Sequence, residues 1–144
     1  MNKLENHFNF TAIKKADFFK RILFCYVTGN EDMHLKNFSL IIKNGKTALA
    51  PIYDFLNSTI TIKNPAAEIA LTLKGKKSNL KAVDFVDYYG KERLQLNEKT
   101  IASILEQMKK ATPEWKELLE ISFLSDDMKE KYLELLKYKL SLFS

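Results

Sequence analysis

Apolar and polar residues alternate along this chain with two different periods, and the pattern divides it into a short β-forming stretch and a longer helical part. Near the N-terminus, an apolar-rich run lies between Thr11, which can cap a helix, and Thr28. Gly29 follows directly and is a typical helix stop. The pattern therefore predicts a helix from Thr11 to Thr28. Its apolar positions include Ile22, Leu23, Cys25 and Tyr26.

The period then changes to that of β-strands. Two runs rich in β-forming residues lie within 38–50, and Asn44-Gly45 separates them. This pair suits a type I′ turn, because both central residues of that turn need positive φ. Pro51 ends the predicted hairpin, and the sequence Ser-Thr-Ile-Thr-Ile within 57–63 predicts another short strand.

From Leu80 onward the pattern is helical. It predicts one helix over 81–89 that ends at Gly90, and a second over 98–111 that is capped by Asn97. In the second helix, four apolar residues recur at helical spacing: Ile101, Ile104, Leu105 and Met108.

Two further helices complete the chain in this interpretation. One begins at Thr112-Pro113, with proline at the first helical position, where no N–H is needed. The last is capped by Ser125, and Asp126 and Asp127 lie favourably near its positive end. We therefore expect a mainly α domain of the α+β class that carries one small hairpin.

The composition is that of an ordinary globular domain of 144 residues, with 46% hydrophobic and 28% charged residues. The net charge of +5 does not by itself indicate nucleic-acid binding, because lysines alternate with acidic residues. The single cysteine, Cys25, cannot form an internal disulfide, no apolar run is long enough to span a bilayer, and the N-terminus lacks a signal-peptide pattern. We expect a single domain over 1–144 in the cytoplasm.

The strongest indication of function is the run Gly-Asn-Glu-Asp-Met-His-Leu-Lys-Asn over 29–37, followed by Tyr-Asp-Phe over 53–55. Asp32 and Asn37 are spaced like the base and the metal-binding asparagine of the protein-kinase catalytic loop. Asp54 precedes an aromatic residue, as the metal-binding aspartate does in the D-F-G motif. An acid, an amide and a second acid are the groups that phosphoryl transfer uses to place a hydroxyl and hold magnesium.

The predicted hairpin gives a geometric reason for these residues to meet. Asn37 and Asp54 flank its two ends, and a tight hairpin returns the end of its second strand beside the start of its first. Asp32 lies just upstream of Asn37, so we expect the three side chains to face one site near the hairpin's open end. The non-catalytic alternative is that Asp32 and Asn37 only form turns, as Asp and Asn commonly do.

At these residues the chain resembles the C-terminal lobe of the HipA-type serine/threonine kinases, the toxins of bacterial HipBA toxin–antitoxin pairs. The catalytic segment of that family reads approximately G-N-x-D-x-H-x-K-N, and a hairpin and L-A-P-x-Y-D follow. Here the two motifs stand at 29–37 and 49–54, and a looser match stands at 71–77. The resemblance implies a protein-kinase-like C-terminal lobe.

The resemblance also implies roles for five residues. Asp32 would accept the proton of the substrate hydroxyl, and Asn37 and Asp54 would hold Mg2+ ions that bridge the phosphates of ATP. His34 and Lys36 would lie close to the transferring phosphate, where they offset its negative charge. The alternatives are that His34 only bridges loop and hairpin by hydrogen bonds, and that Lys36 is simply solvated.

A second resemblance leaves the substrate class open. The order Asp32-x-His34-x-x-Asn37 is similar to the D-R-H-x-x-N of the phosphatidylinositol 3- and 4-kinases. A lipid or small-molecule kinase is therefore an alternative to a protein kinase. It ranks lower, because no membrane-binding amphipathic helix stands out in the sequence.

Part of a kinase is missing from the sequence. A kinase also needs a glycine-rich loop over the nucleotide and a strand lysine, but the four glycines are far apart and only a dozen residues precede the first predicted helix. We therefore expect an N-lobe from another segment or chain. The resemblance further implies a HipB-like DNA-binding antitoxin as partner and a protein as substrate. A non-catalytic or split module that pairs with an N-lobe or an antitoxin is the alternative function.

We predict that the isolated chain binds Mg2+-ATP weakly or not at all. The glycine-rich loop and the strand lysine that contact the phosphates are absent from the sequence, although the acidic residues that would hold the metal are present. Isothermal titration calorimetry of the chain with Mg2+-ATP measures this directly. Micromolar or tighter affinity would contradict the prediction.

Overall fold

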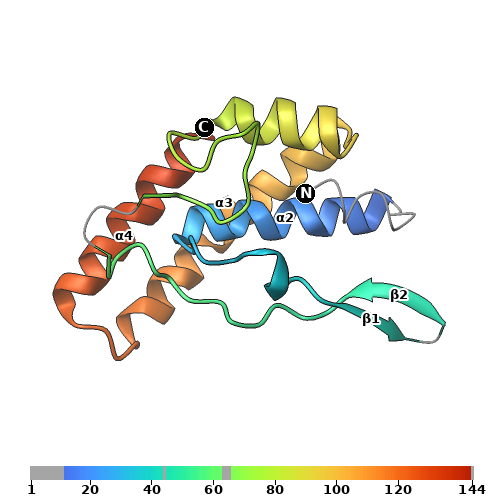
Figure 1. The fold of residues 1–144 in the computed structure, drawn as a ribbon. Helices are drawn as coiled ribbons and strands as arrows, with labels where there is room; N and C mark the ends of the chain where they lie inside the picture. The colour runs from blue at the N-terminus through green and yellow to red at the C-terminus, as the bar shows by residue number, and fades with distance from the viewer. Residues whose placement is uncertain (1–11, 44, 63–65, 144) are drawn as a thin grey trace.

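The computed structural model describes residues 12–43, 45–62 and 66–143, and helices predominate in it (Figure 1). Its described part contains one sheet, which has two antiparallel strands. The structure is therefore α+β and mostly helical, as the sequence predicts. In chain order the elements are α2 (Ala12–Thr28), the 3-10 turn η1 (Leu35–Asn37), β1 (Leu40–Lys43), β2 (Lys46–Leu49), the π-helix η2 (Asp84–Arg93), α3 (Glu98–Glu120) and α4 (Asp126–Ser141).

Helix α2 lies at the centre of the fold, where it contacts α3, α4 and η2 (Figure 1). All four apolar residues that the sequence pattern assigns to this helix are buried. The helix ends at Gly29, which has a φ of +72° and whose N–H donates to the carbonyl oxygen of Tyr26 at 3.3 Å. The N–H of Asn30 donates to the carbonyl oxygen of Cys25 at 2.9 Å, which completes a Schellman motif. The predicted helix stop is confirmed, whereas the predicted cap, Thr11, lies outside the described residues.

Strands β1 and β2 form the predicted hairpin, which extends away from the helices (Figure 1). Their register leaves a two-residue turn. Asn44 lies outside the described residues, and Gly45 has the positive φ, +72°, that the predicted turn needs. At the open end, Nη1 of Arg21 on α2 donates to the carbonyl oxygen of Ala50 at 2.6 Å. The hairpin is thus tied to the central helix just before the segment that carries the second motif.

The strand predicted within 57–63 is wrong for the part of that segment that the structure describes, which forms turns. The N–H groups of Ser58 and Thr59 both donate to the carbonyl oxygen of Gly29, at 3.1 Å each. The Thr59 hydroxyl donates to the same oxygen at 2.8 Å. The β-branched residues favour a strand, but the carbonyl oxygen of Gly29, at the end of α2, accepts hydrogen bonds from the N–H groups that a strand would use.

The helix predicted to end at Gly90 continues past it as the π-helix η2, and this part of the prediction is wrong. The N–H of Leu94 donates to the carbonyl oxygen of Tyr89, five residues back, at 3.0 Å. Gly90 does not end the helix, and the space around it has no room for a side chain. A Cβ atom there would lie 2.8 Å from Ile101 Cδ1 and 3.1 Å from Phe19 Cε2. The absence of a side chain therefore lets η2 pack closely against α2 and α3.

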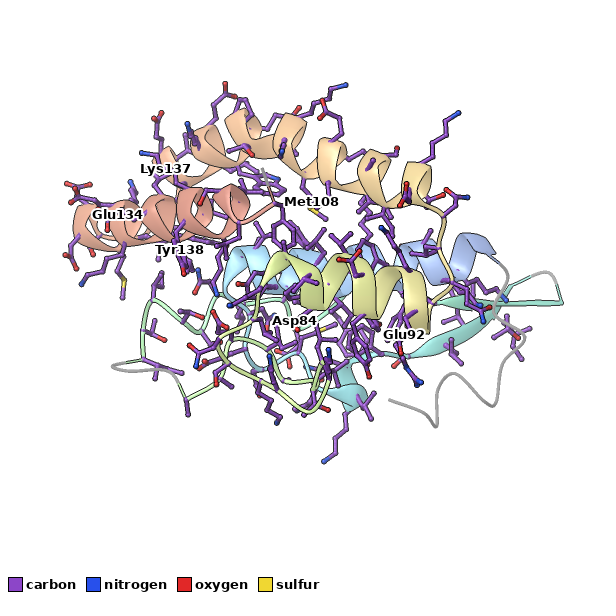
Figure 2. The ribbon with its side chains drawn as sticks, turned by 90° about the horizontal axis from the view of Figure 1, so that it is seen from above. Asp84, Glu92, Met108, Glu134, Lys137 and Tyr138 are labelled. Atoms are coloured by element: carbon purple, nitrogen blue, oxygen red, sulfur yellow. The ribbon has the colours of Figure 1, made fainter. Side chains whose placement is uncertain are left out.

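The helix start predicted at Thr112-Pro113 is also wrong, because α3 runs through Pro113 as one helix. Its apolar stripe crosses the proline without interruption. Burial of this stripe against α2 and α4 outweighs the backbone hydrogen bond that proline cannot make. The stripe consists of the buried Ile101, Ile104, Met108 and Leu119 and the partly buried Trp115, and Figure 2 labels Met108 on α3.

The caps predicted at Asn97 and Ser125 are confirmed. The side chain of Asn97 accepts a hydrogen bond from the N–H of Thr100 at 2.8 Å at the start of α3. The hydroxyl of Ser125 accepts one from the N–H of Met128 at 3.4 Å at the start of α4. Each bond satisfies a backbone donor that the first helical turn leaves free.

A partly buried ion pair joins α4 to the loop that precedes Leu80. Nζ of Lys139 pairs with the carboxylate of Glu68 and lies 3.9 Å from the centre of the Tyr26 ring. Burial lowers the pKa of Lys139, and the Glu68 carboxylate opposes this shift. Glu68 also accepts the N–H of Leu80 at 2.8 Å, and the Tyr26 hydroxyl donates to the carbonyl oxygen of Leu80 at 3.2 Å. The loop is thereby fixed against α2 and α4.

The described helices include none with the length and apolar character needed to cross a membrane. Large apolar side chains are nevertheless exposed, mostly on the hairpin and the segments that flank it in the sequence, and the exposed face of α4 labelled in Figure 2 carries Glu134, Lys137 and Tyr138. Seven of the twelve exposed large hydrophobic residues in the described part lie within 35–62: Leu35, Ile41, Ile42, Ile52, Tyr53, Leu56 and Ile62.

We predict that Gly90→Ala destabilises the protein, although Gly→Ala stabilises an ordinary helix. The added Cβ meets Ile101 and Phe19 in a packed interior, and such overpacking costs about 1–3 kcal/mol. Urea unfolding followed by circular dichroism measures the change. The control is Ser103→Ala at an exposed position of α3, which should change stability by less than about 0.5 kcal/mol. A Gly90→Ala variant as stable as the parent would refute the close-packing argument.

Candidate functional site

The candidate site begins where α2 ends, in the segment that carries the first motif. Asn30 is buried, and its Oδ1 accepts the N–H of Asp32 at 3.1 Å. Met33 is buried, whereas its neighbours Asp32 and His34 are exposed. The N–H of His34 donates to the carbonyl oxygen of Asp32 at 2.7 Å, which turns the chain sharply. Buried anchors at Asn30 and Met33 therefore direct the Asp32 side chain to the surface.

The 3-10 turn η1 follows and places Asn37. This side chain is buried, and its Nδ2 lies 3.3 Å from Oδ2 of Asp54 and 3.5 Å from the backbone carbonyl oxygen of Asp32. One amide thus joins the residues of both motifs. The backbone N–H of Asn37 donates to the carbonyl oxygen of His34 at 2.9 Å, so the turn itself is closed by a backbone hydrogen bond.

Asp54 has an unusual backbone conformation. Its φ is +54°, in the left-handed region that residues other than glycine rarely adopt. Its carboxylate is exposed on one side and held by Asn37 on the other. The next residue, Phe55, stacks on Phe24 of α2, with ring centres 4.8 Å apart and planes 14° apart.

Glu31 adds a second carboxylate beside Asp32. Its backbone N–H donates to the hydroxyl of Ser58 at 3.2 Å, so the segment after α2 is also bonded to the turns at 57–59. Burial raises the pKa of Glu31, and the neighbouring charge of Asp32 raises it further. This part of the site therefore disfavours additional negative charge and favours a cation.

Of the five residues that the sequence analysis singles out, Asn37 and Asp54 contact each other through their side chains, and Asp32 contacts Asn37 through its backbone carbonyl oxygen. The contact between Asn37 and Asp54 lies at the open end of the hairpin. His34 and Lys36 have exposed side chains, and the contacts that they make within the site are made by their backbone atoms.

The oxygen atoms gathered here suit a hard cation such as Mg2+. Mg2+ prefers carboxylate, amide and water oxygens, and it is commonly held by one or two protein carboxylates together with substrate phosphates. The described residues contain no group of three or more His, Cys, Asp or Glu side chains that could enclose a metal ion alone. The site thus offers a partial set of ligands, which a phosphate ligand can complete.

The sequence analysis misses the hydrogen bonds of Tyr53. The Tyr53 hydroxyl donates to the carbonyl oxygen of Lys36 at 2.9 Å and lies 2.6 Å from Oγ of Ser39. The sequence analysis also misses the hydrogen bonds that Ser58 and Thr59 donate to the carbonyl oxygen of Gly29. These contacts join segments that are far apart in the sequence, and the β-branched residues within 57–62 favour a strand instead, so no local pattern indicates them.

Comparison with known proteins gives two results. The HipA-like C-terminal domain family matches residues 2–115. Two similar proteins are the Putative kinase of Haemophilus influenzae, 46% identical over 54 residues, and Putative kinase Y4dM of Sinorhizobium fredii, 50% identical over 44 residues. These matches cover 37% and 30% of this chain but only 15% and 11% of the two relatives, so the chain spans a small part of their length.

We predict that replacements at Asp54 follow the order of left-handed propensity. Asp54→Asn should have stability close to that of the parent, because asparagine tolerates positive φ. Asp54→Ala loses the Asn37 hydrogen bond and adds conformational strain. Asp54→Gly loses the same bond without strain and should be more stable than Asp54→Ala by about 1 kcal/mol in urea unfolding.

Asp87 in η2 is the matched control, because it has a helical backbone. There the order should reverse, with Asp87→Ala more stable than Asp87→Gly by about 1 kcal/mol. The same order at both positions would contradict the strain at Asp54.

Proposed function

Because the chain belongs to the HipA-like C-terminal domain family, we propose that it is the catalytic lobe of a serine/threonine protein kinase of the HipA type. The kinase transfers the γ-phosphate of ATP to a hydroxyl of a protein substrate. The observation that carries the proposal is the hydrogen bond between Asn37 and Asp54, which joins two motifs 17 residues apart in one site.

In this proposal Asp32 is the general base. Its backbone is held by Asn30, and its carbonyl oxygen accepts from His34 and Asn37, so the position of the residue is fixed while its carboxylate remains exposed. An exposed, positioned carboxylate can accept the proton of a substrate hydroxyl as that hydroxyl attacks the γ-phosphorus. The bond from the γ-phosphorus to the bridging oxygen breaks, and ADP leaves with the electron pair.

Asn37 and Asp54 would hold Mg2+. The fit rests on the donor set described above, since an amide oxygen and a carboxylate are hard oxygen ligands on adjacent segments. When bound, Mg2+ neutralises the phosphate charges of ATP. Asn37 would use its Oδ1 for this purpose, because its Nδ2 faces Asp54. We assign His34 and Lys36 to the transferring phosphate, where an imidazole and an ammonium group can oppose the developing negative charge.

The exposed apolar residues around the hairpin support an N-lobe as partner. Seven large hydrophobic side chains are exposed within 35–62, on the same segments that carry the site. Such a concentration is typical of a surface that another domain covers. The much greater length of the two relatives is consistent with that domain in the same polypeptide. We further propose a toxin–antitoxin role with a HipB-like antitoxin as second partner, in keeping with the family resemblance.

The same surface also suits a second candidate function, that of a non-catalytic module that only pairs with an N-lobe chain. The two candidates make different demands on Asp32, since pairing needs an apolar surface and catalysis needs the carboxylate. Substitutions at Asp32 therefore discriminate between them.

We predict that the chain, assembled with its N-lobe, phosphorylates serine or threonine on a protein and that Asp32→Asn reduces turnover by about 10²–10⁴-fold without changing the KM for ATP. Asp54→Asn should instead raise the Mg2+ concentration needed for half-maximal rate, and added Mg2+ should restore part of the activity. Transfer of radiolabelled phosphate from ATP measures both effects.

Asp127→Asn serves as the control, because Asp127 is an exposed carboxylate at the start of α4. It should leave turnover and Mg2+ dependence unchanged. If the assembled parent transfers no phosphate, or if Asp32→Asn is fully active, the kinase assignment is wrong and the pairing module replaces it.

A further inference from the structure

The hydroxyl of Tyr53 connects the two segments of the site. It donates to the carbonyl oxygen of Lys36 at 2.9 Å and lies 2.6 Å from Oγ of Ser39. A tyrosine hydroxyl can donate one hydrogen bond, and Tyr53 donates it to the carbonyl oxygen of Lys36. The Ser39 hydroxyl is therefore the donor in the bond between Ser39 and Tyr53. The result is a continuous chain of hydrogen bonds that runs from Ser39 through Tyr53 to Lys36.

The partners of this hydroxyl lie on both sides of Asn37. Lys36 precedes Asn37, Ser39 follows two residues later, and Tyr53 directly precedes Asp54. The two bonds of Tyr53 are 2.9 and 2.6 Å long, whereas the direct bond from Asn37 to Asp54 is 3.3 Å long. Both Tyr53 bonds fall within the usual O–H···O range of about 2.5–3.0 Å, and the Asn37 bond is slightly longer than a usual N–H···O bond. The hydroxyl therefore adds two well-formed links between the same two segments that the Asn37 bond joins.

Packing alone does not account for a tyrosine at this position. The side chain is 43% exposed, so its ring is only partly buried. The neighbouring Phe55 already supplies the aromatic contact to α2 through its stacking on Phe24. The distinctive contribution of Tyr53 is its hydroxyl.

We propose that Tyr53 is a positioning residue for the Mg2+ site, whose hydroxyl fixes the separation of Asn37 and Asp54. The inference rests on the proposed function, since it concerns the same two ligands. Mg2+ demands near-ideal octahedral geometry, so a small displacement of one ligand weakens binding. Asp54 also has a strained φ of +54°, and a bond at the preceding residue opposes its relaxation.

The experiment uses Mn2+ as a paramagnetic substitute for Mg2+ and follows the side-chain amide signal of Asn37 in the 1H–15N spectrum of the chain. In the parent, Mn2+ should broaden this signal before it broadens signals from α3 and α4. In Tyr53→Phe, which keeps the ring, the Mn2+ concentration for half-maximal broadening should rise about 10-fold. Ser39→Ala, which removes one of the two bonds, should give a smaller rise.

Tyr138→Phe is the control, because Tyr138 is an exposed tyrosine on α4 and its removal should not change the Mn2+ concentration. The rest of the amide spectrum and the urea midpoint should stay unchanged in Tyr53→Phe, since the freed carbonyl of Lys36 can bond to water. A general change in the spectrum would show a structural role and overturn the proposal.

The outcomes separate the two hypotheses. Equal Mn2+ concentrations for Tyr53→Phe and the parent overturn the positioning role and leave the metal site intact. Absence of selective broadening at Asn37 in the parent overturns the metal ligation by Asn37 on which the positioning role rests, whereas phosphate transfer by the chain assembled with its N-lobe tests the proposed function separately.

Discussion

The geometry of the site depends on one residue without a side chain, Gly29. Its φ of +72° ends α2, and its carbonyl oxygen accepts three hydrogen bonds, from the N–H groups of Ser58 and Thr59 and from the Thr59 hydroxyl. A Cβ atom at this position would lie 2.6 Å from Cδ2 of Leu135 on α4. The central helix, the turns after the second motif and the last helix therefore meet at Gly29. The chain leaves this junction in a fixed direction, which determines where Asp32 lies.

Around that junction, the protein separates the residues that position the site from those that carry its chemistry. Asn30, Met33 and Asn37 are buried, and hydrogen bonds or packing hold each of them. The carboxylates of Asp32 and Asp54 are exposed between these anchors. Side chains anchored in this way keep their positions without a bound ligand, and preorganisation of that kind lowers the cost of binding.

The sequence predicts most of the fold because local signals and packing agree there. Gly29, the hairpin and the caps at Asn97 and Ser125 each have a short-range physical cause that a pattern can reveal. The errors arise where tertiary contacts override such signals. Gly90 suggests a helix stop, yet it is required for close contact between helices, and Pro113 suggests a boundary although the apolar stripe of α3 continues past it. Reading that stripe beyond the proline would have revealed one helix.

The meeting of Asn37 and Asp54 follows from hairpin geometry, which is why the sequence could suggest it. The bonds of Tyr53 and Ser58 could not be predicted, because they join segments whose relative position only the folded chain determines. Side-chain hydroxyls bond equally well to many backbone groups, so their partners leave no pattern in the sequence.

The left-handed backbone at Asp54 has a consequence for how such a lobe changes through evolution. Of the side chains with a Cβ atom, asparagine and aspartate adopt this conformation most readily. A codon for aspartate becomes one for asparagine by a change of its first nucleotide. The mutation that most directly removes the acid is thus also among the gentlest for the fold. A variant that keeps the fold but lacks this carboxylate is therefore one nucleotide change away.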